Sequence, residues 1–204
     1  MFRVLLCHLC LCAVLLCAGR ADAAPKRAPM GQMDPRLDLL FRLGFGGNIE
    51  IEAEPVAIKP DAALTLGGDL RLDFPVHRFV TLGPVLGVYA AKEDFSFVDR
   101  NVLVDVATFL KARYPFTLGS QRRAAETYLL LQVGLTLGFS DEDSWGTERF
   151  GPGWNIGFGL GFESFVSKRV GLLAEIGWAR SQANFDVEVI IRQGSFRLGP
   201  VIRF

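Results

Sequence analysis

The sequence predicts an all-β fold, a closed antiparallel up-and-down transmembrane β-barrel of about eight strands. From Trp154 to Glu163, large apolar side chains alternate with glycine or polar residues, and such a period of two places successive side chains on opposite faces of a strand. About eight stretches show an apolar face of this kind with no separate layer to cover it, so hydrocarbon is the expected cover. Because an open sheet edge in hydrocarbon would leave peptide groups unpaired, the sheet is expected to close.

Residues 1–23 are predicted to be a cleaved secretory signal peptide. Arg3 supplies a positive charge, Val4 to Ala18 is an apolar run, and Ala21-Asp22-Ala23 is a cleavage site of the A-x-A type. The apolar run is shorter than the ~20 residues that a membrane-spanning helix needs. All four cysteines of the chain lie in this leader, so no disulfide is expected in the exported protein: Cys7, Cys10, Cys12 and Cys17.

Residues 24–35 contain three prolines without an apolar period, which predicts a flexible segment ahead of a barrel domain at 36–204. The alternation then predicts the following strands: Arg36–Ile51, Ala62–Phe74, Phe79–Ala91, Asn101–Tyr114, Thr127–Phe139, Gly153–Phe165, Val170–Ala179 and Val189–Phe204.

The links between these strands alternate in character, as a barrel with both ends of its chain on one side requires. Links two, four and six are expected in the periplasm, at residues 75–78, 115–126 and 166–169. Links one, three, five and seven are expected to face outward, at residues 52–61, 92–100, 140–152 and 180–188. The fourth link is long for a periplasmic turn, and we expect a short helical or irregular excursion there.

One parity of residues in every strand is apolar and is predicted to face lipid. This outward set contains no Asp, Glu, Lys or Arg: Leu37, Leu39, Phe41, Leu43, Phe45, Leu64, Leu66, Leu70, Leu72, Phe74, Val80, Leu82, Leu86, Val88, Val102, Val104, Val106, Leu110, Leu129, Leu131, Val133, Leu135, Leu137, Phe139, Trp154, Ile156, Phe158, Leu160, Phe162, Val170, Leu172, Ile176, Trp178, Phe196, Leu198, Ile202 and Phe204. An arginine or lysine facing the bilayer midplane would cost ~2–4 kcal/mol, which explains the absence. Leu135→Arg should therefore disrupt insertion, and Thr136→Arg should be tolerated better if space permits.

The opposite parity collects the charged residues, which we predict to point into the lumen: Asp38, Arg42, Glu50, Asp69, Arg71, Asp73, Asp105, Lys111, Arg113, Glu163, Glu175, Arg197 and Arg203. An eight-stranded barrel is only wide enough for its own side chains, so these groups should pair with one another. Inward glycines would leave room for the long side chains. The pattern favours a salt-bridged plug, and a gated ion path or a ligand site is the functional alternative.

No catalytic, cofactor or metal site is predicted. His8 leaves with the leader, and His77 lies in a periplasmic turn, on the wrong side for surface lipid chemistry. The acidic run at residues 140–144 lacks EF-hand spacing, and the glycines at 157, 159 and 161 lack the strand–turn–helix context of a nucleotide loop. The formal net charge of zero does not favour a nucleic-acid partner.

The last ten residues, Ser195 to Phe204, resemble the closing strand of bacterial outer-membrane barrels, which ends in an aromatic residue. With the leader and the eight stretches, the chain resembles the small OmpA/OmpX-type barrels. This resemblance implies Phe204 as an assembly signal, with periplasmic chaperones and the barrel-assembly machinery as transient partners. Pro200 departs from the usual strand composition and is expected at an edge-like or bulged position.

The sequence therefore favours a non-enzymatic, monomeric barrel in the outer membrane of a Gram-negative-type bacterium. It would contact membrane lipid and lipopolysaccharide, and serve envelope structure or surface interaction through its loops. A narrow or gated pore, a lipid-modifying enzyme and a soluble secreted barrel of the lipocalin type are the alternatives.

Overall fold

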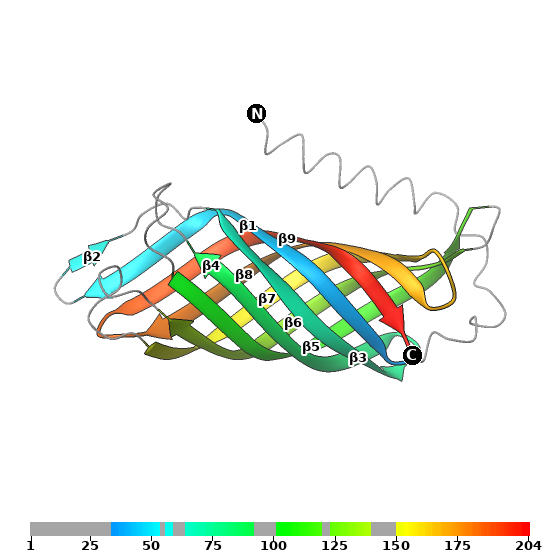
Figure 1. Ribbon diagram of the computed structural model, residues 1–204, viewed down its shortest axis with the longest axis horizontal. Helices are drawn as coiled ribbons and strands as arrows, with labels where there is room; N and C mark the ends of the chain where they lie inside the picture. The colour runs from blue at the N-terminus through cyan, green and yellow to red at the C-terminus, as the bar shows by residue number, and fades with distance from the viewer. Residues whose placement is uncertain (1–33, 54–55, 59–63, 92–100, 120–122, 140–149) are drawn as a thin grey trace, which may run out of the picture.

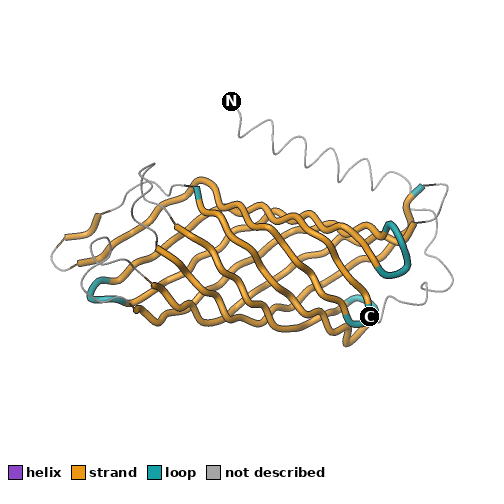
Figure 2. Tube along the Cα trace, in the orientation of Figure 1, coloured by secondary structure: helices purple, strands orange, loops and turns teal. Residues whose placement is uncertain are grey.

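The computed structural model describes residues 34–53, 56–58, 64–91, 101–119, 123–139 and 150–204. These residues form nine strands: β1 (Arg36–Ala53), β2 (Val56–Ile58), β3 (Thr65–His77), β4 (Val80–Ala91), β5 (Asn101–Leu118), β6 (Arg123–Phe139), β7 (Phe150–Phe165), β8 (Val170–Asn184) and β9 (Glu188–Arg203). Figure 2 shows strands joined by turns, and none of the described residues is helical. Among them there is accordingly no helix long and apolar enough to cross a membrane.

The strands form one closed ring, which confirms the predicted barrel (Figure 1). Eight of them pair antiparallel with their neighbours in the order β1, β3, β4, β5, β6, β7, β8 and β9. The ring closes because β9 also pairs with β1, from Arg203 beside Arg36 to Glu188 beside Glu52. The short β2 adds only to the end of β1. Each strand of the ring thus has a pairing partner on both sides, as a hydrocarbon environment requires.

The ring has two distinct ends. The terminal end carries Arg36, Arg203 and the turns at 78–79 and 166–169, and the loop end carries Ala91, Asn101, Asn184 and Glu188. In Figure 1 the C-terminus marks the terminal end, and β2 lies at the loop end. The predicted outer link at 92–100, residues 140–149 of the predicted link at 140–152, and residues 1–33 lie outside the described residues.

Side chains alternate between the interior and the exterior along the strands of the ring, with an interruption in β1. In β3, for example, Thr65, Asp69, Arg71 and Asp73 are buried, and the apolar residues between them are exposed. None of the apolar side chains predicted to face lipid is buried. The exterior is therefore the apolar surface and the interior the polar one, the reverse of a soluble sheet.

The prediction of a helical or irregular fourth link was wrong. β5 continues to Leu118 and β6 begins at Arg123, with strand pairing maintained up to those two residues. Phe116 explains part of this extension, because its ring packs against Tyr114 and Phe162 at centroid distances of 6.5 and 6.2 Å. The hairpin thus extends the wall at the terminal end.

A β-bulge interrupts the alternation of β1. Gly46 and Gly47 have φ values of 61° and 93°, which favour glycine, and the register with β9 shifts between Phe45 and Asn48. The bulge exchanges the two faces of the strand. After it, odd-numbered residues such as Ile49 point into the barrel.

Pro200 lies at neither an edge nor a bulge. The register of β9 with β1 is the same before and after Pro200, because Asp38 lies beside Val201 and Phe41 beside Leu198. The two residue pairs between these positions are missing. The physical reason is that proline has no N–H to donate. Gly199 accommodates the close approach of the strands, since a Cβ there would overlap the carbonyl oxygen of Leu39.

Candidate functional site: the charged interior

The structure places twelve of the thirteen predicted lumen charges inside the barrel. All twelve are buried, and none is more than 6% exposed: Asp38, Arg42, Asp69, Arg71, Asp73, Asp105, Lys111, Arg113, Glu163, Glu175, Arg197 and Arg203. They come from six of the eight ring strands, all except β4 and β6. The interior is therefore a set of ionic contacts between strands that are distant in sequence.

Glu50 is also buried, with 5% of its surface exposed, but its predicted inward orientation was wrong. It follows the bulge in β1, so it lies on the face opposite Ile49. Its carboxylate accepts a hydrogen bond from Arg192 of β9 at 2.7 Å. The bulge could not be read from period two alone, although the adjacent glycines at 46 and 47 are its sequence signal.

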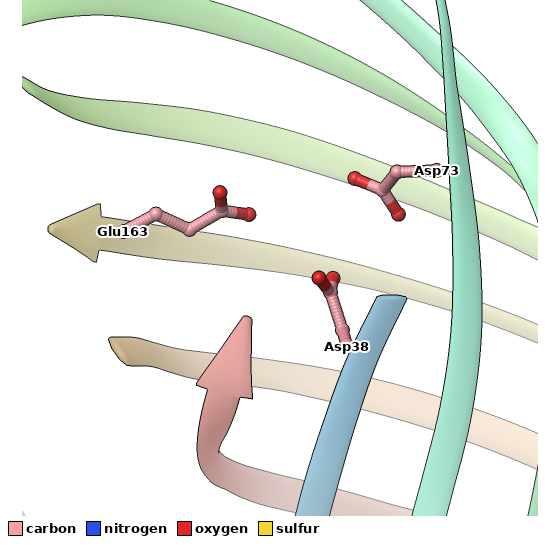
Figure 3. Close-up of side chains that lie close together, drawn as sticks. All are labelled: Asp38, Asp73 and Glu163. Carbon is pink, nitrogen blue, oxygen red and sulfur yellow. The ribbon is translucent and has the colours of Figure 1, made fainter. Parts of the chain in front are cut away.

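Lys111 lies at the centre of the cluster nearest the terminal end. Its Nζ atom donates to carboxylates from three strands, Asp73 at 2.5 Å, Glu163 at 3.0 Å and Asp38 at 3.4 Å. Figure 3 shows the three carboxylates directed toward one another from different parts of the wall. The ammonium group also lies 4.5 Å from the centroid of the Tyr128 ring. A single buried cation thus holds three acidic groups together.

The same three carboxylates have the spacing of a metal site, with one oxygen from each lying within 4.8 Å of the others. Lys111 already supplies the positive charge at this position. A metal ion would have to displace an ammonium group that contacts all three carboxylates. We therefore interpret the cluster as an internal ion-pair network, with lysine in the place of a cation.

Arg36 continues this network toward the terminal end. Its guanidinium contacts Glu126, and it donates to Glu163 at 2.7 Å. Arg113 lies 3.6 Å from Oε2 of Glu126, an oxygen that Arg36 also contacts. Arg203 stacks on the ring of Phe165, with 3.2 Å between the guanidinium carbon and the ring centroid. These contacts fill the terminal end of the lumen.

A second cluster lies around Glu175. Arg71 donates to both of its oxygens, at 2.7 and 2.9 Å, in the bidentate geometry that makes such pairs strong. Arg197 bridges Glu175 and Asp69 through two of its nitrogens, and Tyr128 donates to Glu175 at 2.8 Å. The five side chains of this cluster are thus joined in one network.

A third cluster, nearer the loop end, surrounds Asp105. This carboxylate accepts hydrogen bonds from Thr136 at 2.6 Å and Asn155 at 3.3 Å, and Arg42 approaches it at 3.4 Å. Arg42 also stacks over the ring of Tyr89, whose hydroxyl donates to Ser181. Thr136 is fully buried, so the space that an arginine at position 136 would need is already filled.

Apolar side chains fill the interior between and beyond these clusters. One group, containing Leu40, Phe109 and Leu173, packs among the charged residues. Another, containing Ile49, Leu103 and Phe185, lies inside the loop end. Ion pairs buried in this way are costly to separate, because either partner alone would be an uncompensated charge.

Sequence reasoning missed two members of the network. Arg36 shares the parity of Asp38 but lies at the predicted strand boundary, and Glu126 was assigned to the fourth link. Both are 1% exposed. Had the predicted strand been extended from Thr127 by one residue toward the N-terminus, the alternation would have placed Glu126 inward, on the same face as Tyr128.

The closed ring, the apolar exterior and the paired charges inside together define an integral β-barrel protein of the outer membrane. No known family model matches the chain, and no curated protein matches it in sequence.

Solved structures of bacterial surface barrels do resemble it. Neisserial surface protein A (NspA) is 15% identical, with 82% of this chain and 97% of that chain covered and a TM-score of 0.51. Ail, the attachment invasion locus protein of Yersinia pestis, is 12% identical over 84% of this chain and 100% of that chain, with a TM-score of 0.42. OprG of Pseudomonas aeruginosa is 10% identical over 84% and 95% of the two chains, with a TM-score of 0.41.

Proposed function

We propose that the protein is a monomeric, non-enzymatic and non-conducting barrel that serves envelope structure or surface interaction through its outer loops. The observation that carries this proposal is the filled interior. Twelve predicted lumen charges are buried and take part in contacts with one another, with Glu126 or with aromatic rings. A conducting path would have to separate several of these contacts at once.

A conductance measurement in planar bilayers tests the non-conducting state. The purified, detergent-folded protein should give no stable current steps at any applied voltage tested. A general porin added to the same bilayer is the positive control and should give current steps over the same voltage range. Stable unitary openings would contradict the proposal and favour the alternative of a narrow or gated pore.

The alternative of a lipid-modifying enzyme has its own measurement. Incubation of the folded protein with lipopolysaccharide should leave the acyl composition unchanged by mass spectrometry. Release or transfer of acyl chains that requires the folded state would contradict the non-enzymatic assignment.

The orientation and the assembly partners are part of the proposal. We place the loop end outside the cell, so that the terminal end faces the periplasm, where the assembly machinery acts. The backbone N–H of Phe204 donates to Pro35 at 3.1 Å beside the closing seam of the ring, and its side chain is 68% exposed. This exposure makes the aromatic ring available to a partner before insertion is complete.

Phe204→Ala should lower the amount of folded barrel in the outer membrane of cells, measured by heat-modifiable migration. Unassisted folding in detergent should change little, which separates recognition by the machinery from intrinsic stability. Unchanged assembly in cells would overturn the role of Phe204.

A further inference from the structure

Two arginines lie directly opposite each other on the outer face of the barrel. Arg180 of β8 is the register partner of Arg192 of β9. Like charges in this position of an antiparallel pair repel each other and are destabilising unless something compensates them. A compensating group is therefore expected on the outer face, where the charged interior cannot supply one.

The orientation of the pair follows from its neighbours. Ser181 and Ile191 alternate with the two arginines and point into the barrel, where Ser181 bonds Tyr89 and Ile191 joins the apolar group. The next outward pair toward the terminal end is Trp178 beside Gly194, followed by Ile176 beside Phe196. The arginines thus lie on the exterior, where the apolar band ends at the loop end.

The two guanidinium groups are only partly compensated by the protein. Arg192 donates to Glu50 at 2.7 Å, and its side chain is 33% exposed. Arg180 lies with its guanidinium carbon 4.9 Å from the centroid of the Trp154 ring. Its Nε atom is buried without a hydrogen-bond partner, and no carboxylate pairs with it among the residues that the structure describes. Among the described residues, the two cations thus have one carboxylate partner, while Glu52 and Glu188, which are register partners of each other, lie further toward the loop end.

We propose that Arg180 and Arg192 bind a phosphate group of a lipopolysaccharide molecule in the outer leaflet. A phosphate between two guanidinium groups converts their repulsion into charge-assisted hydrogen bonds, for which the planar arginine fork is well suited. Trp154 fixes Arg180 at the depth where aromatic residues contact headgroups. The inference rests on the orientation proposed above, but it does not depend on whether the lumen conducts.

Native mass spectrometry of the detergent-folded protein tests the site. The variant R180Q/R192Q should bind bisphosphorylated lipid A more weakly, by roughly tenfold or more, since the charge-assisted hydrogen bonds to the phosphate are lost. The matched control R78Q/R169Q removes two exposed arginines from turns at the terminal end and should keep the affinity of the natural protein. Dephosphorylated lipid A should bind both variants and the natural protein equally.

Two further readouts distinguish phosphate binding by the arginines from a purely structural role. R180Q alone removes one of the two like charges and keeps the ion pair between Arg192 and Glu50, so it should leave the unfolding midpoint in lipid-free detergent unchanged or raised, whereas a purely structural role of Arg180 predicts a lower midpoint. If the double variant does not fold, R180Q alone should show the same selective loss. Equal binding of bisphosphorylated lipid A by natural protein and variant would overturn the proposal. Competition by inorganic phosphate at the same concentration as lipid A would overturn a lipid headgroup as the source of the phosphate.

Discussion

At the scale of the residue, Lys111 is the clearest example of how this interior is stabilised. Its ammonium group contacts three carboxylates that come from β1, β3 and β7. None of these contacts is local in sequence, so the lysine ties together parts of the wall that do not pair directly with its own strand. Its contribution to the stability of the barrel is therefore expected to be seen mainly as the loss that its removal causes.

Lys111→Met should lower the free energy of unfolding by about 3–5 kcal/mol, because it leaves the buried carboxylates without their cation. Urea titration of the folded barrel in detergent or vesicles measures this loss. Lys168→Met, in an exposed turn, is the matched control and should change the value by less than about 0.5 kcal/mol. Equal effects of the two substitutions would contradict the central role of Lys111.

Gly161 shows how glycine makes room for a polar network. A Cβ at this position would overlap the ring of Tyr128, which donates to Glu175. Gly161→Ala should displace this ring and cost about 1–3 kcal/mol, as overpacking generally does. Gly68→Ala, where the nearest atom to the added Cβ is 3.2 Å away on the outer face, should be the milder change. Thermal unfolding of both variants compares them, and a reversed order would be inconsistent with this packing.

At the scale of the element, period two predicted each ring strand and which face of it meets lipid. It failed where a strand departs from regular geometry. Glu50 follows a bulge that reverses the faces, and Glu126 belongs to a strand extension that the proline at 115 concealed. Alternation shows which charged side chains point inward but not which of them lie next to each other. The three clusters around Lys111, Glu175 and Asp105 therefore became visible only in the three-dimensional structure.

The lipid-facing register can be tested at Val133, midway along the outward series of β6 and 52% exposed. Val133→Arg should cost ~2–4 kcal/mol of folding free energy in a bilayer, because the charge would enter hydrocarbon. Val133→Ala is the control and should have a smaller effect. Folding into vesicles, followed by heat-modifiable migration, gives both values. Comparable losses for arginine and alanine would show that this side chain does not face lipid.

The open edge of β5 at the terminal end is protected by Pro115. The backbone N–H of Arg113 donates to the carbonyl oxygen of Phe79. Backbone nitrogens two residues apart in a strand point to the same side, so the nitrogen of Pro115 points to this same edge. β4 begins at Val80, and no strand in the described part of the chain lies beside that edge further on. Because proline has no N–H, it blocks pairing with another strand there.

Pro115→Val should restore a donor at this edge and increase self-association, measured as dimers by light scattering in detergent. Thr117→Val, which keeps the proline, should remain as monomeric as the natural protein. A Pro115→Val variant that stays monomeric at all concentrations would argue against a protective role.

At the scale of the whole molecule, the fold was accessible from sequence because the bilayer imposes one rule on every strand, apolar outward and polar inward. The architecture thus follows from a repeated local pattern. The function does not, since small barrels of one architecture serve different tasks. The sequence did not reveal the outer-face arginines as a pair, because Arg180 was assigned to the seventh link whereas β8 continues to Asn184, and because their direct opposition across β8 and β9 depends on register.

The stability of this ring depends on its exterior being covered by hydrocarbon. Folding of the leader-free chain from urea, with and without lipid vesicles, tests this dependence. We predict that vesicles yield a protease-resistant, heat-modifiable barrel inserted in the bilayer, and that dilution into buffer alone yields aggregated or unfolded chain. A folded monomer that stays in solution without lipid or detergent and does not bind vesicles would contradict a membrane-embedded barrel.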